Sequence, residues 1–294
     1  MSEQNLTQEQ IRGLQRRGFE MLIYFRDFCK EHDLMFYLCG GCCIGGMRDG
    51  KFIPWDDDVD VFMPRPDYER LARLWNRLAD TEKYSYQAPT KAQGTRNQFA
   101  TIHCNGSTFI KTYQQDLDIN HGIMMDVIPL DGCPTGRFAR KIQKFYALLY
   151  SLMIVEAAPE NHGKAVEFLG KMLLFLIPGH RARFALAKRC ERKMCRTPFY
   201  NAEKITELCT GPHYMQNEYP KACFAKQHWG TLEGEPMPFP GDYDTYMTMA
   251  FGDWHQLPPE EKRVIHHDYV KIEPDVPYLN YRGTLYAADN KTKK

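Results

Sequence analysis

LCGGCCIGGMRDGKFIPWDDDVDV, residues 38–61, is the stretch that decides the fold, because it ends in acids that alternate with valines. Alternate side chains of a strand share a face, so the alternation predicts a strand over residues 59–63. Asp58 and Asp60 would then point one way and the valines into the core. The Cα atoms of Asp58 and Asp60 would lie about 6.6 Å apart, two strand rises, and two carboxylates at that spacing can hold a hard cation and would repel each other without one.

Two plainer interpretations of these acids stay open. The spacing Asp56-x-Asp58-x-Asp60 is that of an EF-hand calcium loop. That loop, however, needs Gly where Val61 stands and Glu where Asp67 stands. The other interpretation is a solvated acidic turn, against which the alternation of acids and valines argues. In the metal-site interpretation, Asp56 and Asp57 precede the strand and would either surround the metal ligands or belong to the loop.

Four glycines between positions 40 and 46 predict a tight loop before the acids. Because glycine lacks a Cβ, the backbone N–H groups of Gly40 and Gly41 can approach an anion closely. Arg48 and Lys51 follow and would add positive charge. Metal-binding carboxylates beside a glycine loop and cations are the minimal set for handling a nucleotide phosphate.

A third acid stands in HGIMMDVIPLD, residues 121–131. Asp126 is the one charge within a strand predicted over residues 123–128, where burial requires a metal or another partner. The plainer alternative makes it a cap or turn acid with hydrogen bonds of its own. Asp131 is assigned to a turn, which the sequence Leu130-Asp131-Gly132 predicts.

The rest of the chain predicts an α+β fold. Thr7 begins a capping box, and apolar residues at helical spacing then predict a helix over residues 8–31. Pro66 suits the first position of another helix. Further strands are expected over residues 34–39, 98–104 and 108–112. We expect helices over residues 136–196, with breaks at 158–159 and 178–179, and after residue 210 loops with one short helix near 243–251. These elements suggest a catalytic core over residues 1–135 and a helical, loop-rich region over residues 136–294.

Composition narrows the class of protein. Thirty-eight Lys and Arg against thirty-seven Asp and Glu leave a net charge of +1, so the chain lacks an overall basic field for nucleic acid. The polar beginning MSEQNLTQEQ predicts no secretory signal, and no apolar run approaches the length of a membrane span. Ten cysteines without a CxxC pair are then expected as reduced thiols of a cytoplasmic protein.

Together these residues resemble the signature of the LicD family, which includes bacterial phosphocholine transferases and is related to fukutin and the fukutin-related protein. The resemblance is carried by Gly40-Gly41, Gly45-Gly46-Met-Arg48 and Phe52-Ile-Pro-Trp-Asp-Asp-Asp-Val-Asp60. It continues in His121-Gly, Met125-Asp-Val-Ile-Pro-Leu-Asp131, Phe239-Pro-Gly-Asp-Tyr243 and Phe251-Gly-Asp-Trp254. The adjacent Cys42 and Cys43 depart from the small polar or aliphatic residues that are common there.

The resemblance implies a nucleotidyltransferase-like fold with a mixed sheet. It implies that Asp58, Asp60 and Asp126 hold Mg²⁺ or Mn²⁺ and that Gly40 and Gly41 lie against the donor. Our own candidates for further donor contacts are Arg48, Lys51 and Trp55.

The activity implied by the resemblance is transfer of a phospho-alcohol group, phosphocholine above all, from a CDP-alcohol to a glycan hydroxyl. The glycan would be a cell-surface polymer such as teichoic acid or lipopolysaccharide. Two alternatives stay open: a nucleotidyltransferase that moves NMP from an NTP to a hydroxyl, and a non-catalytic metal- or glycan-binding protein.

A basic run and a set of aromatic residues suggest two kinds of binding partner, an anionic membrane and choline. Residues 181–196 hold seven Lys and Arg and one acid, Glu191. They predict either a solvated helix face or a contact with the inner face of an anionic membrane, where a lipid-linked acceptor would lie. Choline would need aromatic faces; the candidates are Trp55, Trp229, Tyr243 and Trp254.

The cysteines and histidines of the second half are the last candidates. Core packing is the usual role of scattered cysteines, and zinc binding is the alternative. His266-His267 is expected to pack or cap rather than to catalyse. The residues concerned in a zinc site would be Cys190, Cys195, Cys209 and Cys223, with His213 and His228.

Overall fold

The protein is described by a computed structural model that covers residues 6–158, 163–263 and 268–288. The helices are α1 (Gln8–Glu31), α2 (Gly40–Asp49), α3 (Arg65–Leu78), α4 (Arg137–Val155), α5 (Lys164–Leu176), α6 (His180–Met194) and α7 (Tyr243–Phe251). The strands are β1 (Tyr37–Leu38), β2 (Asp60–Pro64), β3 (Tyr84–Gln87), β4 (Ala100–Cys104), β5 (Thr108–Lys111), β6 (Ile123–Gly132), β7 (Lys204–Thr206), β8 (Tyr219–Pro220), β9 (Gln227–Leu232), β10 (Glu235–Pro240) and β11 (Tyr269–Glu273).

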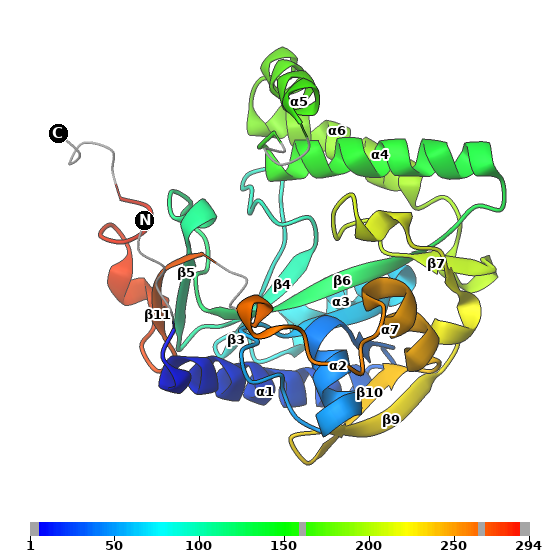
Figure 1. Ribbon diagram of the computed structural model, residues 1–294. Coiled ribbons are helices and arrows are strands. Elements are labelled where there is room, and N and C mark those ends of the chain that lie inside the picture. Colours follow the sequence, from blue (N-terminus) through cyan, green and yellow to red (C-terminus); the bar gives the residue numbers. More distant parts are fainter. Residues whose placement is uncertain (1–5, 159–162, 264–267, 289–294) are drawn as a thin grey trace.

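A mixed sheet forms the centre of the molecule (Figure 1). Its strand order is β1-β2-β6-β4-β3, in which β2 and β6 are parallel and the other neighbours are antiparallel. β7 pairs with the end of β6, and β8 pairs with β7. β9 and β10 form a separate antiparallel pair, as do β5 and β11. The predicted α+β class with a mixed sheet is confirmed.

One face of the sheet is covered by α1 and α3. The capping box at Thr7 and the helix over residues 8–31 are confirmed. The indole of Trp75 in α3 packs on Phe25 and Phe28 of α1, with ring centroids 5.9 and 4.7 Å apart. The valines of the acidic stretch are buried in this same core cluster. The predicted division of acids and valines between two faces is therefore confirmed.

Three differences from the predicted elements matter for the site. β2 begins at Asp60, one residue later than expected. β6 continues through Gly132, because β2 pairs with it up to Leu130 and β7 pairs with its last two residues. The stretch after residue 210 contains β8 to β11, where loops were expected. β10 was missed because proline, which cannot donate to a strand ladder, occupies every second position from Pro236.

The helical region has a core of its own, formed by α4, α5 and α6 together with Leu208, Cys209 and Met215. Figure 1 shows these helices gathered on one side of the molecule, with α5 outermost. The expected helix breaks and α7 are confirmed.

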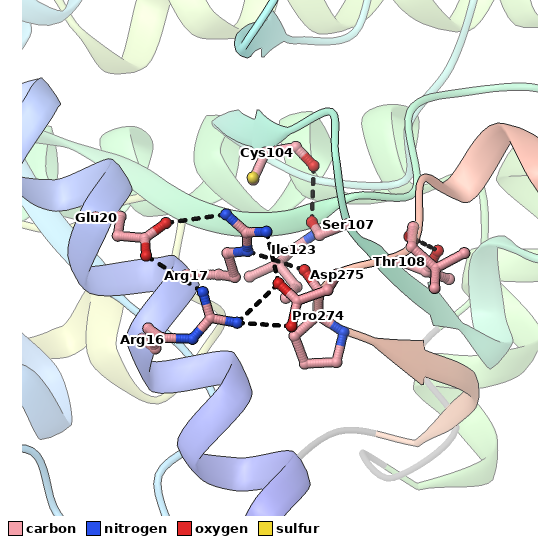
Figure 2. Close-up of polar contacts among 10 residues, drawn as sticks. Arg16, Arg17, Glu20, Cys104, Ser107, Thr108, Ile123, Pro274 and Asp275 are labelled. Atoms are coloured by element: carbon pink, nitrogen blue, oxygen red, sulfur yellow. Dashed lines mark hydrogen bonds and ion pairs between the residues drawn. The ribbon is translucent and has the colours of Figure 1, made fainter.

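The C-terminal part of the described chain returns to the first half. β11 pairs with β5, and Asp275 accepts hydrogen bonds from Arg16 (2.8 Å) and Arg17 (2.6 Å) of α1 (Figure 2). The division of the chain at residue 135 stays a prediction.

Candidate active site

The three acids singled out in the sequence meet at one cavity. Asp60 in β2 and Asp126 in β6 are direct partners in the parallel strand pair, and Asp58 precedes β2. The backbone N–H of Asp126 donates to the carbonyl of Val59 (2.9 Å). This hydrogen bond extends the pairing of the two strands to the residue before β2. All three acids line a cavity of about 310 Å³. The structure thus brings them together, while their role as metal ligands stays a prediction.

Burial makes this cluster unfavourable for several negative charges at once. It raises the pKa of Asp60 well above its ordinary value, and the charges of Asp58 and Asp126 add to the rise. Burial also raises the pKa of Asp56, helped by Asp58 and Asp57. Among the described residues, no hydrogen-bond partner reaches Asp60 Oδ1 or Asp56 Oδ2. A cation would relieve both the repulsion and the unmet bonding.

The acids before β2 form a second group of potential ligands. One carboxylate oxygen from each of Asp56, Asp57 and Asp58 lies within 4.8 Å of the others. Gln15 of α1 fixes this turn, because its Nε2 donates to the carbonyls of Ile53 (2.9 Å) and Asp56 (3.0 Å). The calcium-loop interpretation is wrong, because the chain enters β2 where that loop would have to continue.

The predicted glycine loop is wrong, because residues 40–49 form the helix α2 directly after β1. Gly40 has a φ of +56°, and its N–H donates to Tyr246 Oη (3.2 Å). A Cβ at Gly41 would lie 1.9 Å from Asp56 Oδ2. The two glycines thus let the helix start against the acids. Contact of their N–H groups with a donor phosphate stays a prediction.

The other predicted donor contacts lie outside the cavity wall. Arg48, in the last turn of α2, forms an ion pair with Asp49 (2.8 Å), and Lys51 is exposed. The guanidinium of Arg263 lies 5.5 Å from the ring centroid of Trp55. Arg48, Lys51 and Trp55 are all described, yet none lines the acid cavity. Their roles in donor binding stay predictions.

The two cysteines that depart from the family pattern are buried in the main core. Burial raises the pKa of both Cys42 and Cys43, so their thiols stay protonated at neutral pH. Neither is among the described residues that line the cavity. They therefore act as small apolar packing residues of α2.

The assignment of Asp131 to a turn is wrong. Its side chain is buried within β6 and accepts two hydrogen bonds from Arg65, to Oδ1 from Nε (2.9 Å) and to Oδ2 from Nη2 (2.6 Å). Arg65 also reaches Glu191 of α6 (3.4 Å). Burial acts to lower the pKa of Arg65, but the charge and hydrogen bonds of Asp131, together with Cys195 and Cys209, hold that pKa above its ordinary value. Through its ion pairs with Asp131 of β6 and Glu191 of α6, Arg65 connects the sheet to the helical region.

A buried lysine that the sequence analysis did not single out faces the acids. Lys111, the last residue of β5, is only 3% exposed. Burial acts to lower the pKa of Lys111, but the charges of Asp126, Tyr113, Asp58 and Asp57 together raise it above its ordinary value. Lys111 in turn acts to lower the pKa of Asp60. Its sequence signal was a lone cation at the end of the apolar run Thr-Phe-Ile.

Glu207 is a second overlooked group, and it lines the same cavity. It follows β7 directly, and burial raises its pKa to about 7. The hydroxyl of Tyr219 donates a hydrogen bond to its Oε1 and so fixes the carboxyl group. Its sequence signal was a single acid in the run Ile-Thr-Glu-Leu-Cys, the same kind of signal that identified Asp126.

Aromatic rings complete the wall of the cavity. The ring centroid of Tyr246 lies 5.6 Å from that of Phe62 and 6.1 Å from that of Phe251. Phe251 is in turn 6.1 Å from Tyr214, and Phe99 also lines the cavity. The four aromatic residues chosen from the sequence are described but do not belong to this wall; they are Trp55, Trp229, Tyr243 and Trp254.

The zinc alternative gains no support. Across the described ranges, the only cluster of three or more potential metal-ligating side chains is the aspartate group before β2. Cys190, Cys195 and Cys209 belong to the core of the helical region, and Cys223 belongs to the main core. The prediction for His266-His267 lies outside the described residues.

The basic run of residues 181–196 falls mainly on α6, and most of its cations are exposed. No helix within the described part of the chain is both long and apolar enough to cross a bilayer.

Comparison with known proteins shows that the stretch with the three acids matches a known family. The family described as LicD/FKTN/FKRP, nucleotidyltransferase domain, matches residues 33–128, which include α2, β2 and Asp126. The chain is 26% identical over 269 residues to the lipopolysaccharide cholinephosphotransferase LicD of Haemophilus influenzae. That alignment covers 87% of this chain and 96% of the relative. Both comparisons support the resemblance of this chain to the LicD family.

Proposed function

We propose that this protein transfers phosphocholine from CDP-choline to a hydroxyl of a cell-surface glycan. The observation that carries the proposal is one cavity that combines the acids Asp58, Asp60 and Asp126 with a buried carboxyl group among aromatic rings. The three aspartates suit a metal-bound diphosphate, whereas the buried carboxyl group and the aromatic rings suit a quaternary ammonium group. The Haemophilus relative, a lipopolysaccharide cholinephosphotransferase, supports the same chemistry.

The acid cluster fits Mg²⁺ or Mn²⁺. Its ligands are carboxylate oxygens, and within the described chain no hydrogen-bond donor reaches the buried Oδ1 of Asp60. Asp58, Asp60 and Asp126 would hold the ion, which would supply positive charge to the diphosphate of the donor and to the departing CMP.

The residues of the chain then have distinct tasks in the transfer. The oxygen of the acceptor hydroxyl forms a bond to the phosphorus of phosphocholine, while the bond from that phosphorus to the CMP oxygen breaks. CMP leaves with the electron pair of that bond, and Asp126 takes the proton of the hydroxyl. Lys111, which is buried beside the acids, adds a fixed positive charge near the reacting phosphate.

Glu207 and the surrounding rings would hold the choline group. A trimethylammonium group has no N–H to donate, so a protein recognises it through ring faces and negative charge. Tyr214, Tyr246 and Phe251 line the cavity together with Glu207. This set replaces the four aromatic candidates chosen from the sequence.

The acceptor side of the proposal follows from the chemistry of the product. A glycan hydroxyl is the nucleophile, and we propose that the glycan is lipid-linked and is reached from the cytoplasm. The contact of residues 181–196 with an anionic membrane stays part of this proposal.

The test is product analysis with the purified chain, Mg²⁺ and a panel of CDP-alcohols that carry choline, ethanolamine, glycerol or ribitol. We expect CMP release that is fastest with CDP-choline and is abolished by chelation of the metal. Pyrophosphate release from an NTP would instead show nucleotidyl transfer. Metal binding without turnover of any donor would show a non-catalytic binding protein.

A further inference from the structure

Exposed apolar side chains are concentrated on two helices of the helical region. The described chain exposes eighteen large hydrophobic residues, and ten of them lie on α4 and α5. Phe175 is 83% exposed and Phe138 is 77% exposed. Exposed apolar residues are normal when scattered, but a contiguous group of them marks a surface that binds a partner or a membrane.

The exposed residues follow helical spacing, so each helix presents a stripe. On α5, Phe168, Met172 and Phe175 are separated by four and three residues and share one face. The buried residues of this thirteen-residue helix are Gly170 and Leu174 alone. α5 therefore rests on the protein by a narrow strip and leaves its broad apolar face uncovered.

The stripe on α4 has the same character. Phe138, Ile142 and Phe145 are separated by four and three residues, and Leu148 continues the stripe one turn further. Figure 1 shows α4 and α5 in the layer farthest from α1, with no other element above α5.

The charge on this layer is strongly positive. α4, α5 and α6 hold twelve Lys and Arg and two Glu, whereas the whole chain has a net charge of +1. Several exposed cations form no ion pair with any described residue; they are Arg137, Lys141, Arg181, Arg189, Arg192 and Lys193. An anionic partner would complement this surface, whereas a second copy of the chain would present the same positive charge.

We propose that the protein docks on an anionic phospholipid bilayer through α4, α5 and α6, with the apolar face of α5 inserted among the lipids. A helix that lies in the membrane interface combines an apolar face with cations that meet anionic headgroups, and this layer provides both. The proposal goes beyond a purely electrostatic contact of residues 181–196, because it assigns the insertion to α5. It does not depend on the transferase activity.

The layer is also connected to the cavity. Tyr150 of α4 donates a hydrogen bond to the backbone carbonyl of Gln98 (2.6 Å), and Gln98 lines the cavity. Docking through this layer would therefore hold the cavity wall next to the membrane-bound helices.

The experiment is co-sedimentation of the full chain with vesicles of phosphatidylcholine alone or mixed in equal parts with phosphatidylglycerol. The test variant is F168E/F175E, which places two acids on the outer face of α5. Its matched control is L257E/L279E, which also places two acids at exposed apolar positions, here two leucines outside the layer. Circular dichroism and thermal unfolding check that each variant folds, and light scattering without lipid gives the mass in solution.

We expect the wild type and the control to bind mixed vesicles and not pure phosphatidylcholine. The partition coefficient of F168E/F175E should fall about tenfold or more. Equal partition of the test variant and the wild type would overturn the proposal, as would failure of the wild type to bind mixed vesicles. A dimer that F168E/F175E dissociates, without vesicle binding by the wild type, would show instead that this face joins two copies of the chain.

Discussion

Asp60 of β2 lies directly opposite Asp126 of β6 in a parallel strand pair, with both acids on the wall of one cavity. Neighbouring strands are about 4.8 Å apart, so the two carboxyl groups are held close by the backbone itself. Burial and the charges of neighbouring acids raise the pKa of Asp60. Paired acids in such a buried position favour a shared proton, or a cation if one binds.

The first prediction concerns these two acids. D60N and D126N should each lower CMP release about 10²–10³-fold or more, since each removes a preorganised group from the site. Without metal, neither variant should unfold at a lower temperature than the wild type, because each relieves repulsion between carboxylates. CMP release and thermal unfolding in the presence of a chelator are the measurements. Retention of a tenth of the activity by both variants would contradict the metal assignment.

The second prediction separates Asp131 from the acids of the site. D131N should lower the free energy of unfolding by about 3–5 kcal/mol, because it leaves Arg65 buried without its charge partner. Chemical denaturation measures this loss. The matched control is R65M/D131L, which removes both charges and should recover most of the stability. A D131N variant with normal stability and no CMP release would show that Asp131, and not Asp126, serves the reaction.

The predictable part of the site came from side-chain alternation. Asp58 and Asp60 were placed on one face and Val59 on the other, because a strand imposes this division whatever it packs against. Asp126 was found as a lone charge in an apolar run. These inferences needed only local periodicity and the cost of burying a charge.

The wrong part came from residues whose role depends on tertiary contacts. Glycine favours turns locally, yet residues 40–49 form a helix because α2 packs tightly between the acids and the hairpin of β9 and β10. Leu-Asp-Gly resembles a turn, yet Asp131 stays in β6 because Arg65, distant in sequence, pairs with it. Lys111 and Glu207 were missed, although each is a lone charge in an apolar run.

The third prediction tests the close approach of Gly41 to Asp56. A Cβ at position 41 would overlap Asp56 Oδ2, so G41A must displace the carboxyl group of Asp56. We expect weaker Mg²⁺ binding by calorimetry and a loss of CMP release of about tenfold or more. The matched control is G106A, because a Cβ at Gly106 would meet nothing within 4 Å. Equal metal affinity of the two variants would show that the aspartate turn is not part of the metal site.

The last prediction concerns Glu207, whose pKa is raised to about 7 by burial. A carboxyl group with a raised pKa in the folded state stabilises the protein below its unfolded pKa, and that contribution is lost as pH rises to the folded pKa. Between pH 4.5 and about 7 the wild type should therefore lose about 3 kcal/mol that E207Q keeps. Urea denaturation of both proteins across this range measures the difference. Tyr214, Tyr219 and Tyr246 stay neutral there, because burial raises the pKa of each.

Binding of choline should have the opposite pH dependence, because only the ionised carboxyl group of Glu207 attracts a quaternary ammonium. Affinity of the wild type for CDP-choline should rise with pH through about 7, whereas E207Q should bind about tenfold more weakly above that pH and show no such rise. Calorimetry at several pH values measures both. The matched control is E218Q, because Glu218 pairs with Arg140 and Lys204 and does not line the cavity. If E207Q and the wild type shared one pH profile for CDP-choline and differed only in stability, Glu207 would be a packing residue and the choline group would bind elsewhere.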